Sequence, residues 1–229
     1  MKKLTAYFSK GERILWGSST ALILISFLLF DRVNTMTLAA SLIGTTSLIF
    51  NAKGNPVGQV LMILFSLLYG LISYTFSYYG EMITYLGMTA PMALFALITW
   101  LRNPFAGNRA EVAVNRIKAA EVYGMLILTL LVTGVFFFVL DHFGTANILP
   151  STLSVTTSFI AVYLTFRRSP YFAMAYAAND VVLIVLWTLA AAEDIRYLSV
   201  IICFMMFLIN DLYGFVNWKR MEKRQLAAM

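Results

Sequence analysis

Long apolar stretches constrain this chain more than any other feature of its sequence. Eight can be drawn, each near the ~20 residues that a helix needs to cross the hydrocarbon core of a bilayer. We place them at residues 14–30, 35–50, 57–79, 82–100, 121–140, 147–166, 171–191 and 196–218. Hydrophobic residues make up 60% of the chain and charged residues 12%, far from the balance of an ordinary globular domain. The predicted fold class is an all-α polytopic membrane protein with eight transmembrane helices.

The net charge of +6 is distributed as in a membrane protein rather than in a nucleic-acid-binding protein. Lys and Arg lie between and beside the apolar segments, where they act as topology signals and contact anionic lipid. We therefore expect the lipid bilayer and no nucleic acid as a partner. Cys203 and His142 are each the only residue of their type, and no catalytic or phosphate-binding motif is present. We predict neither an enzyme nor a cofactor or metal site.

The two halves of the chain resemble each other at a nearly constant offset. Asp31 pairs with Asp141, the run 45–47 with 156–158, and the Glu81–Tyr85 spacing recurs at Glu193–Tyr197. This pattern predicts two parallel pseudo-symmetric repeats, since each copy holds an even number of spans. We expect an N-terminal repeat over residues 1–118 and a C-terminal repeat over residues 119–229.

Polar residues inside the last two apolar segments indicate where a ligand would bind. Asn179 and Asp180 lie in the seventh segment, and Asn210 and Asp211 fall at a similar depth in the eighth. A carboxylate well inside a bilayer costs at least ~2.5 kcal/mol unless it faces protein or water and has a partner. The alternative interpretation is a structural hydrogen-bond network that holds helices together.

Helical spacing extends this candidate site to further residues. Tyr213 and Asn217 share a helix face with Asn210, and Trp187 lies on the face of Asp180 two turns nearer the outside. We expect Trp187 to offer a stacking surface, with ordinary helix packing as the alternative. The candidate substrate-binding residues are Trp187, Asn179, Asp180, Asn210, Asp211, Tyr213 and Asn217.

Other aromatic and helix-breaking residues have more ordinary explanations. Trp16, Trp100 and Trp218 fall near the predicted cytoplasmic boundary, where aromatic belts are typical. We expect all three to be belt residues. Pro91 interrupts the fourth segment, and the stretch 82–92 around it is a candidate gating kink.

Three stretches of the chain resemble the bacterial PnuC family of nicotinamide riboside transporters. They are INDLYGFVNWKR near the C-terminus, AYAANDVVLIVLW before it, and the first-half stretch from NPVGQVLMILF to YLGMTAPM. The resemblance covers nearly the whole chain. It implies two three-helix bundles joined by a linker helix, similar in outline to SWEET sugar transporters, with one additional N-terminal helix.

The resemblance also implies a function in vitamin uptake for NAD biosynthesis. The expected activity is facilitated diffusion of nicotinamide riboside across the bacterial cytoplasmic membrane, with cytoplasmic phosphorylation trapping the substrate. Thiamine or another nucleoside-like vitamin is an alternative substrate, because related members carry these compounds. A non-transporting membrane scaffold subunit is an alternative from another class. The sequence leaves the oligomeric state open, with a homo-oligomer as one option.

The charge pattern makes a prediction about topology. Fifteen of the seventeen Lys and Arg residues fall on one side if both termini are cytoplasmic, and only Arg32 and Arg196 fall outside. Reporter fusions at Met229 and at an extended N-terminus should both report a cytoplasmic location. An external signal from either fusion would contradict the eight-span topology.

Overall fold

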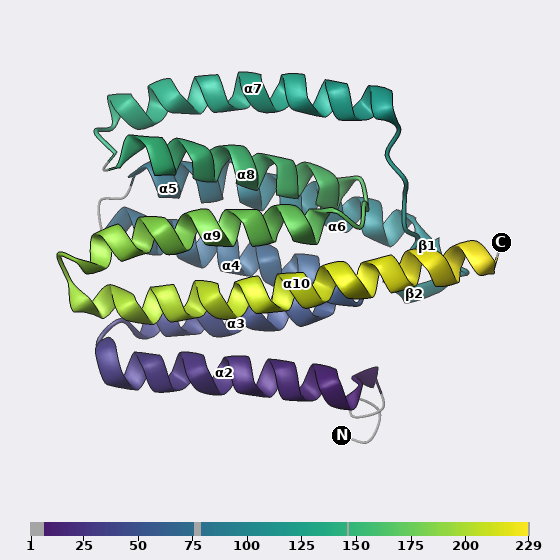
Figure 1. Cartoon of the computed structure of the whole chain (residues 1–229), viewed down its shortest axis with the longest axis horizontal. Coiled ribbons are helices and arrows are strands. Elements are labelled where there is room, and N and C mark those ends of the chain that lie inside the picture. Colours follow the sequence, from purple (N-terminus) through teal and green to yellow (C-terminus); the bar gives the residue numbers. More distant parts are fainter. Residues whose placement is uncertain (1–6, 76–78, 146, 229) are drawn as a thin grey trace.

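The computed structural model describes residues 7–75, 79–145 and 147–228. Within these residues, eight helical segments are long and apolar enough to cross a membrane, which confirms the predicted fold class. They run side by side along the molecule (Figure 1). The elements in chain order are α2 Lys10–Phe30, α3 Thr35–Ala52, α4 Val57–Thr75, α5 Tyr79–Ile83, the π-helix η1 Thr84–Thr89, α6 Ala90–Arg102, β1 Pro104–Phe105, β2 Asn108–Val112, α7 Ala119–His142, α8 Ile148–Phe166, α9 Phe172–Ala191, the 3₁₀ turn η2 Ile195–Tyr197 and α10 Leu198–Ala227.

The first and last helices are longer than hydrophobicity predicts. α2 begins four residues early, at Lys10, because Ser9 and Glu12 form a capping box: Ser9 Oγ accepts from Glu12 N at 3.2 Å and Glu12 Oε2 accepts from Ser9 N at 2.6 Å. α10 continues to Ala227 because its end packs on the β1–β2 hairpin. Gln225 makes hydrogen bonds there with the backbone of Val112 and Val114 at 3.0 and 2.7 Å. The hairpin lies in the predicted connection between spans four and five.

The fourth span changes its helical winding near its middle. α5, η1 and α6 form one continuous span, but the six residues Thr84–Thr89 have π-helical geometry. Pro91 is the second residue of α6 and has no N–H, so it cannot donate to a carbonyl of the preceding turn. π-Turns are frequent at functional sites. This irregularity lies in the predicted stretch 82–92.

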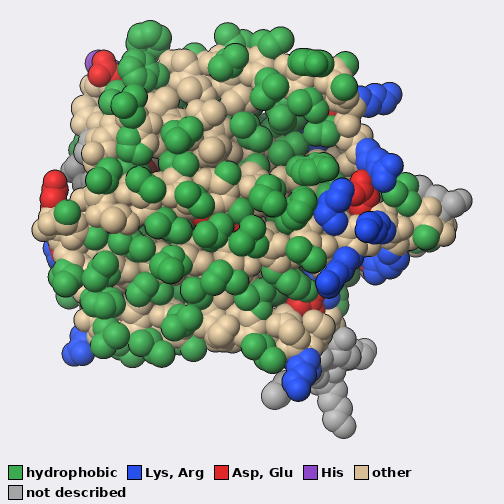
Figure 2. Space-filling model, in the orientation of Figure 1, with side chains coloured by type: hydrophobic (Ala, Val, Ile, Leu, Met, Phe, Trp, Pro, Cys, Tyr) green, Lys and Arg blue, Asp and Glu red, His purple; other side chains and the backbone are tan. Residues whose placement is uncertain are grey.

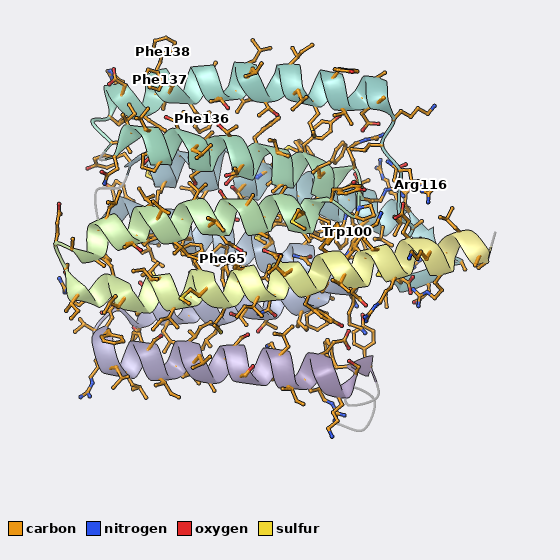
Figure 3. All side chains as sticks on the ribbon, viewed as in Figure 1. Phe65, Trp100, Arg116, Phe136, Phe137 and Phe138 are labelled. Carbon is orange, nitrogen blue, oxygen red and sulfur yellow. The ribbon has the colours of Figure 1, made fainter. Side chains whose placement is uncertain are left out.

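The helices at the two edges of the bundle have different surroundings. α2 lies at one edge and packs on α3 and α10, whereas α7 lies at the other and packs mainly on α8 (Figure 1). Phe136 of α7 lies between α7 and α8, while Phe138 points away from the bundle and is 72% exposed (Figure 3). An apolar helix with so little protein contact is suited to lipid.

Charged side chains separate the two ends of the bundle. At the end of α10, Lys and Arg side chains gather beside the hairpin, as Figure 2 shows. We call this the basic end. It carries Arg102, Arg109, Arg116, Lys118, Arg220, Lys223 and Arg224. The opposite end, which we call the acidic end, holds the turns with Asp31, Asp141, Glu193 and Asp194.

The turns that follow α3 and α8 share one backbone conformation. Gly54 and Arg168 have φ angles of 65° and 57°, in the left-handed region that favours glycine. Their N–H groups donate to Asn51 O at 2.9 Å and to Thr165 O at 3.0 Å. Each turn carries a proline two residues later. These matching turns support the predicted duplication, whose boundary at residues 118 and 119 stays a prediction.

Two tryptophans connect the halves of the chain at the basic end. Trp100 Nε1 donates to Thr165 O at 2.9 Å, and Trp218 Nε1 donates to Asn51 O at 2.8 Å. Each indole thus reaches the turn that ends a helix of the other half. The two rings lie 5.4 Å apart between centroids, beside Phe172.

The expected belt position is therefore wrong for two of the three tryptophans. Trp100 is 1% exposed and Trp218 is 0% exposed, because both indoles pack in the protein core. Trp16 is 41% exposed, and its Nε1 donates to Thr46 Oγ1 at 3.2 Å. Depth along the bundle does not distinguish a lipid-facing indole from a buried one.

We expect Trp218→Phe to destabilise the protein by ~1–3 kcal/mol, since it removes a buried hydrogen bond and leaves a cavity. Trp100→Phe should cost a similar amount, because its indole makes the equivalent contact. The measurement is thermal unfolding in detergent. Trp16→Phe is the matched control and should change the melting temperature least; equal shifts for all three variants would contradict this role.

Candidate functional site

A small cavity lies between the two halves of the chain, about midway along α9. α9 contributes Asn179 and Asp180, and α10 contributes Asp211. The first half contributes mainly aliphatic and aromatic side chains, among them Phe65 and Tyr85. The cavity volume is about 40 Å³, and one water molecule needs ~10–15 Å³ on this measure. It has room for a few waters, so a larger ligand requires the lining side chains to move apart.

Two carboxyl groups give this central cavity its charge. Asp180 and Asp211 are each 4% exposed, and their carboxyl groups lie next to each other. Within the described residues, no N–H or hydroxyl group donates to Asp180 Oδ2. The described lining contains no Lys or Arg. Two carboxyl groups in contact share one proton, so the pair carries one negative charge, and in a low-dielectric environment this charge attracts a cation and suits the cavity to a positively charged ligand.

Hydroxyl groups of α8 fix the orientation of the Asn179 amide. Its Oδ1 accepts from Thr157 Oγ1 at 2.8 Å, from Ser158 Oγ at 3.0 Å and from Ser154 Oγ at 3.4 Å. The amide nitrogen makes no hydrogen bond that the described residues supply. Because its oxygen is occupied, Asn179 offers the cavity mainly the two N–H donors of its Nδ2.

Aromatic side chains form the opposite wall. The Phe65 ring lies 5.9 Å from Tyr85 and 5.8 Å from Phe207 between centroids, and Figure 3 shows Phe65 in the interior of the bundle. Sequence reasoning used Tyr85 only as a marker of the repeat and did not assign Phe65 or Phe207. The sequence signal that could have identified Tyr85 as a cavity residue is its position inside an apolar segment, six residues before Pro91. The rings supply flat surfaces on which a planar cation can stack.

The polar face of α10 turns away from this cavity. Asn210 Nδ2 donates to Ser19 Oγ of α2 at 2.9 Å, and Tyr213 hydroxyl donates to Glu12 Oε1 at 2.9 Å. Asn217 Nδ2 donates to Ala52 O at the end of α3 at 2.8 Å. These contacts correspond to the alternative interpretation, in which polar groups hold helices together. Substrate contact by Asn210, Tyr213 and Asn217 stays a prediction.

Trp187 lies nearer the acidic end than the central cavity does. It is 6% exposed, and its ring centroid is 5.2 Å from that of Tyr197. It lines two cavities at the acidic end and does not line the one that contains Asp180. The structure thus brings together Asn179 and Asp180 of α9 and Asp211 of α10, whereas Trp187 lies nearer the acidic end of α9.

A multi-pass membrane bundle with a charged, partly aromatic cavity at its centre has the architecture of a small-molecule transporter. The chain belongs to the family described as nicotinamide mononucleotide transporters, which matches residues 34–220, from the turn after α2 into α10. This is a family of membrane transporters and not of enzymes.

The chain resembles a known sequence and a solved structure over nearly its full length. It is 26% identical to the nicotinamide riboside transporter PnuC of Neisseria mucosa over 221 residues, which cover 91% of this chain and 84% of that protein. The crystal structure of the vitamin B3 transporter PnuC has the same fold, with a TM-score of 0.82, 22% identity, and coverage of 95% of this chain and 94% of that one.

The Ser19–Asn210 contact can be separated from substrate binding. We expect Asn210→Ala to destabilise the protein by ~1–3 kcal/mol, because it removes a buried hydrogen bond between α10 and α2. The folded variant should bind the transported compound as the wild type does. Thermal unfolding and ligand titration in detergent measure the two properties.

Ser19→Ala is the matched variant, since it removes the same hydrogen bond from the α2 side. The double variant should cost less than the sum of the two single ones, because the two residues share one interaction. An affinity loss of ~5-fold to 150-fold in folded Asn210→Ala would instead support the predicted contact with substrate.

Proposed function

We propose that this protein takes up nicotinamide riboside by facilitated diffusion. The observation that carries the proposal is the charge of the central cavity, where Asp180 and Asp211 lie together and no described lining residue is basic. The pyridinium ring of nicotinamide riboside is cationic and flat. It can balance the carboxylates and stack on Phe65 or Tyr85. The relative from Neisseria mucosa is named as a transporter of the same compound.

The same charge argues against nicotinamide mononucleotide, the compound in the family's description. Its phosphate carries about −1.5 to −2 charges at neutral pH, as in other phosphate monoesters. Phosphates in proteins are usually bound by Arg, Lys or helix N-termini. The described cavity lining offers no basic side chain, and its carboxylates would repel the phosphate.

Asn179 supports recognition of a nucleoside. Its two N–H donors can pair with the carboxamide oxygen or with ribose hydroxyls of the substrate. Thiamine is also a flat cation and remains the second candidate substrate, because the charge of the cavity suits both. Thiamine has neither a carboxamide nor a ribose, so loss of the Asn179 donors should affect the two ligands differently.

The proposed direction of uptake follows from the charge of the two ends. We place the basic end in the cytoplasm and the acidic end outside, because cytoplasmic loops are enriched in Lys and Arg. Phosphorylation of the substrate in the cytoplasm would then trap it: the product carries the negative charge that the central cavity disfavours.

A binding panel tests this proposal. Nicotinamide riboside should bind most tightly among nicotinamide riboside, nicotinamide mononucleotide, thiamine and uridine. In Asp180→Asn, the affinity for nicotinamide riboside should fall by roughly 10-fold to 150-fold, because the variant removes the charge that balances the ring: opposite unit charges ~4 Å apart interact by ~4 kcal/mol at an effective dielectric constant of ~20, and desolvation offsets part of this. The affinity for the mononucleotide should fall less. Titration calorimetry on purified protein provides the measurement.

Asp141→Asn is the matched control, because Asp141 is an exposed carboxylate of the acidic end. It should leave all four affinities unchanged. Tightest binding of thiamine would reassign the substrate. No binding of any of the four compounds, by protein shown to be folded, would favour the scaffold alternative.

A further inference from the structure

A row of cavities leads from the acidic end toward the central cavity. The outer one has a volume of about 210 Å³ and is lined by Glu81, Trp187 and Glu193, among others. A middle cavity of about 20 Å³ shares Glu81 with the outer one. The middle cavity also shares Tyr85 and Leu183 with the central cavity. The shared residues define a path along α9 and the fourth span.

Carboxylates mark successive points of this path. Glu193 lines the outer cavity, Glu81 lines both the outer and the middle cavity, and Asp180 lines the central one. The described linings of all three cavities contain no Lys or Arg. Acidic walls of low dielectric focus the field and concentrate cations while they repel anions.

Glu81 differs in its surroundings from Asp194, another carboxylate of the acidic end. Asp194 is paired with Arg196, whose Nε donates to Asp194 Oδ2 at 2.8 Å. The ion pairs of the described residues do not include Glu81. Its carboxyl group lies beside two neutral hydroxyl groups, those of Tyr69 and of Ser73, and Ser73 Oγ is 3.5 Å from Glu81 Oε2. A carboxylate with neutral neighbours, on the wall of a cavity, is free to act on a passing cation.

The narrowest point of the path lies directly beyond Glu81. The middle cavity holds at most one or two waters, so a nucleoside can pass only if its wall moves. Tyr85 belongs to that wall and lies in η1, where π-helical geometry replaces the regular hydrogen bonding of the helix. A ligand would therefore wait in the outer cavity, beside Glu81, until the path widens.

We propose that Glu81 is a specificity-determining residue for transport: its carboxylate holds the cationic ring of the substrate between the outer cavity and the central cavity. This inference rests on the proposed function. It adds a second point of charge selection to the one at Asp180 and Asp211. Because Glu81 does not line the central cavity, it acts on the rate at which substrate arrives and not on equilibrium affinity at the centre.

The test compares nicotinamide riboside with its 1,4-dihydro form, which keeps the carboxamide and ribose but has a neutral ring. In proteoliposomes with the acidic end outside, Glu81→Gln should lower the initial uptake rate of nicotinamide riboside by about tenfold or more. The uptake rate of the dihydro form should be unchanged. Glu81→Asp, which keeps the charge, should recover part of the lost rate.

Equilibrium titration of Glu81→Gln in detergent completes the experiment. The affinity for nicotinamide riboside should stay within about threefold of the wild-type value, which also shows that the variant is folded. Asp141→Asn is the matched control, since it removes an exposed carboxylate of the acidic end that lines none of the three cavities. It should transport both compounds like the wild type.

Three results would overturn the inference. They are unchanged uptake of nicotinamide riboside by Glu81→Gln, an equal loss for both compounds, and a fall in affinity as large as the fall in rate. Wild-type protein that neither binds nor transports nicotinamide riboside would overturn the proposed function as well. The wild-type arm thus distinguishes failure of the proposed function from failure of the role of Glu81.

Discussion

Two indole–carbonyl hydrogen bonds link the halves of this protein at the basic end, where both indoles are buried in the core. Trp100 and Trp218 each bind the backbone of the turn that ends a helix in the other half. With Phe172, the indoles fill the space between the halves at this end. Ion pairs reinforce the closure: Arg116 Nε lies 2.8 Å from Glu222 Oε1. The central cavity is closed toward the basic end, whereas the row of cavities continues from it toward the acidic end.

The distribution of charge explains how such a closed bundle can carry a cation. Basic side chains are confined to the ends of the helices, where water and lipid head groups solvate them. The charged groups that line the interior cavities are carboxylates, at Asp180, Asp211 and Glu81. A bilayer penalises isolated charges, so interior carboxylates persist where they face a cavity and a mobile counter-charge can reach them. The proposed selectivity for positive ligands thus rests on the placement of a few residues.

The additional helix α2 contacts polar residues of α10 that the sequence analysis assigned to a binding site. Ser19 accepts a hydrogen bond from Asn210, and Glu12 accepts one from Tyr213. Glu12 also forms an ion pair with Lys53, whose Nζ lies 3.1 Å from Glu12 Oε1. In a membrane, lipid tails offer helices little hydrophobic reason to associate, so such hydrogen bonds contribute to their association. α2 lies outside the part of the chain that matches the family, and these contacts fasten it to the remaining helices.

The sequence by itself determined the eight spans, the separation of charge between the ends and the depth of the polar residues. These properties follow from one-dimensional quantities: the length of an apolar segment, the position of Lys and Arg, and the distance of a residue from a segment's centre. The same reasoning selected Asn179, Asp180 and Asp211, which the structure places around one cavity. The tertiary structure alone decided which neighbour each side chain meets. Asn210 and Asp211 are adjacent and about 100° apart on one helix, so periodicity could not show that the first faces α2 and the second the cavity.

The same limit applies to the tryptophans and to the fourth span. Trp16, Trp100 and Trp218 have similar depths, but the first is exposed and the other two are buried, because packing around the axis of a helix is independent of depth. The position of Pro91 indicated an irregularity, whereas the π-helical turn before it and the contribution of Tyr85 to two cavities depend on the helices packed against it. Depth is a property of the chain and the bilayer. The direction in which a side chain points around the helix axis, and hence the neighbour that it meets, is a property of the assembled bundle, since it is defined only once neighbouring helices are in place.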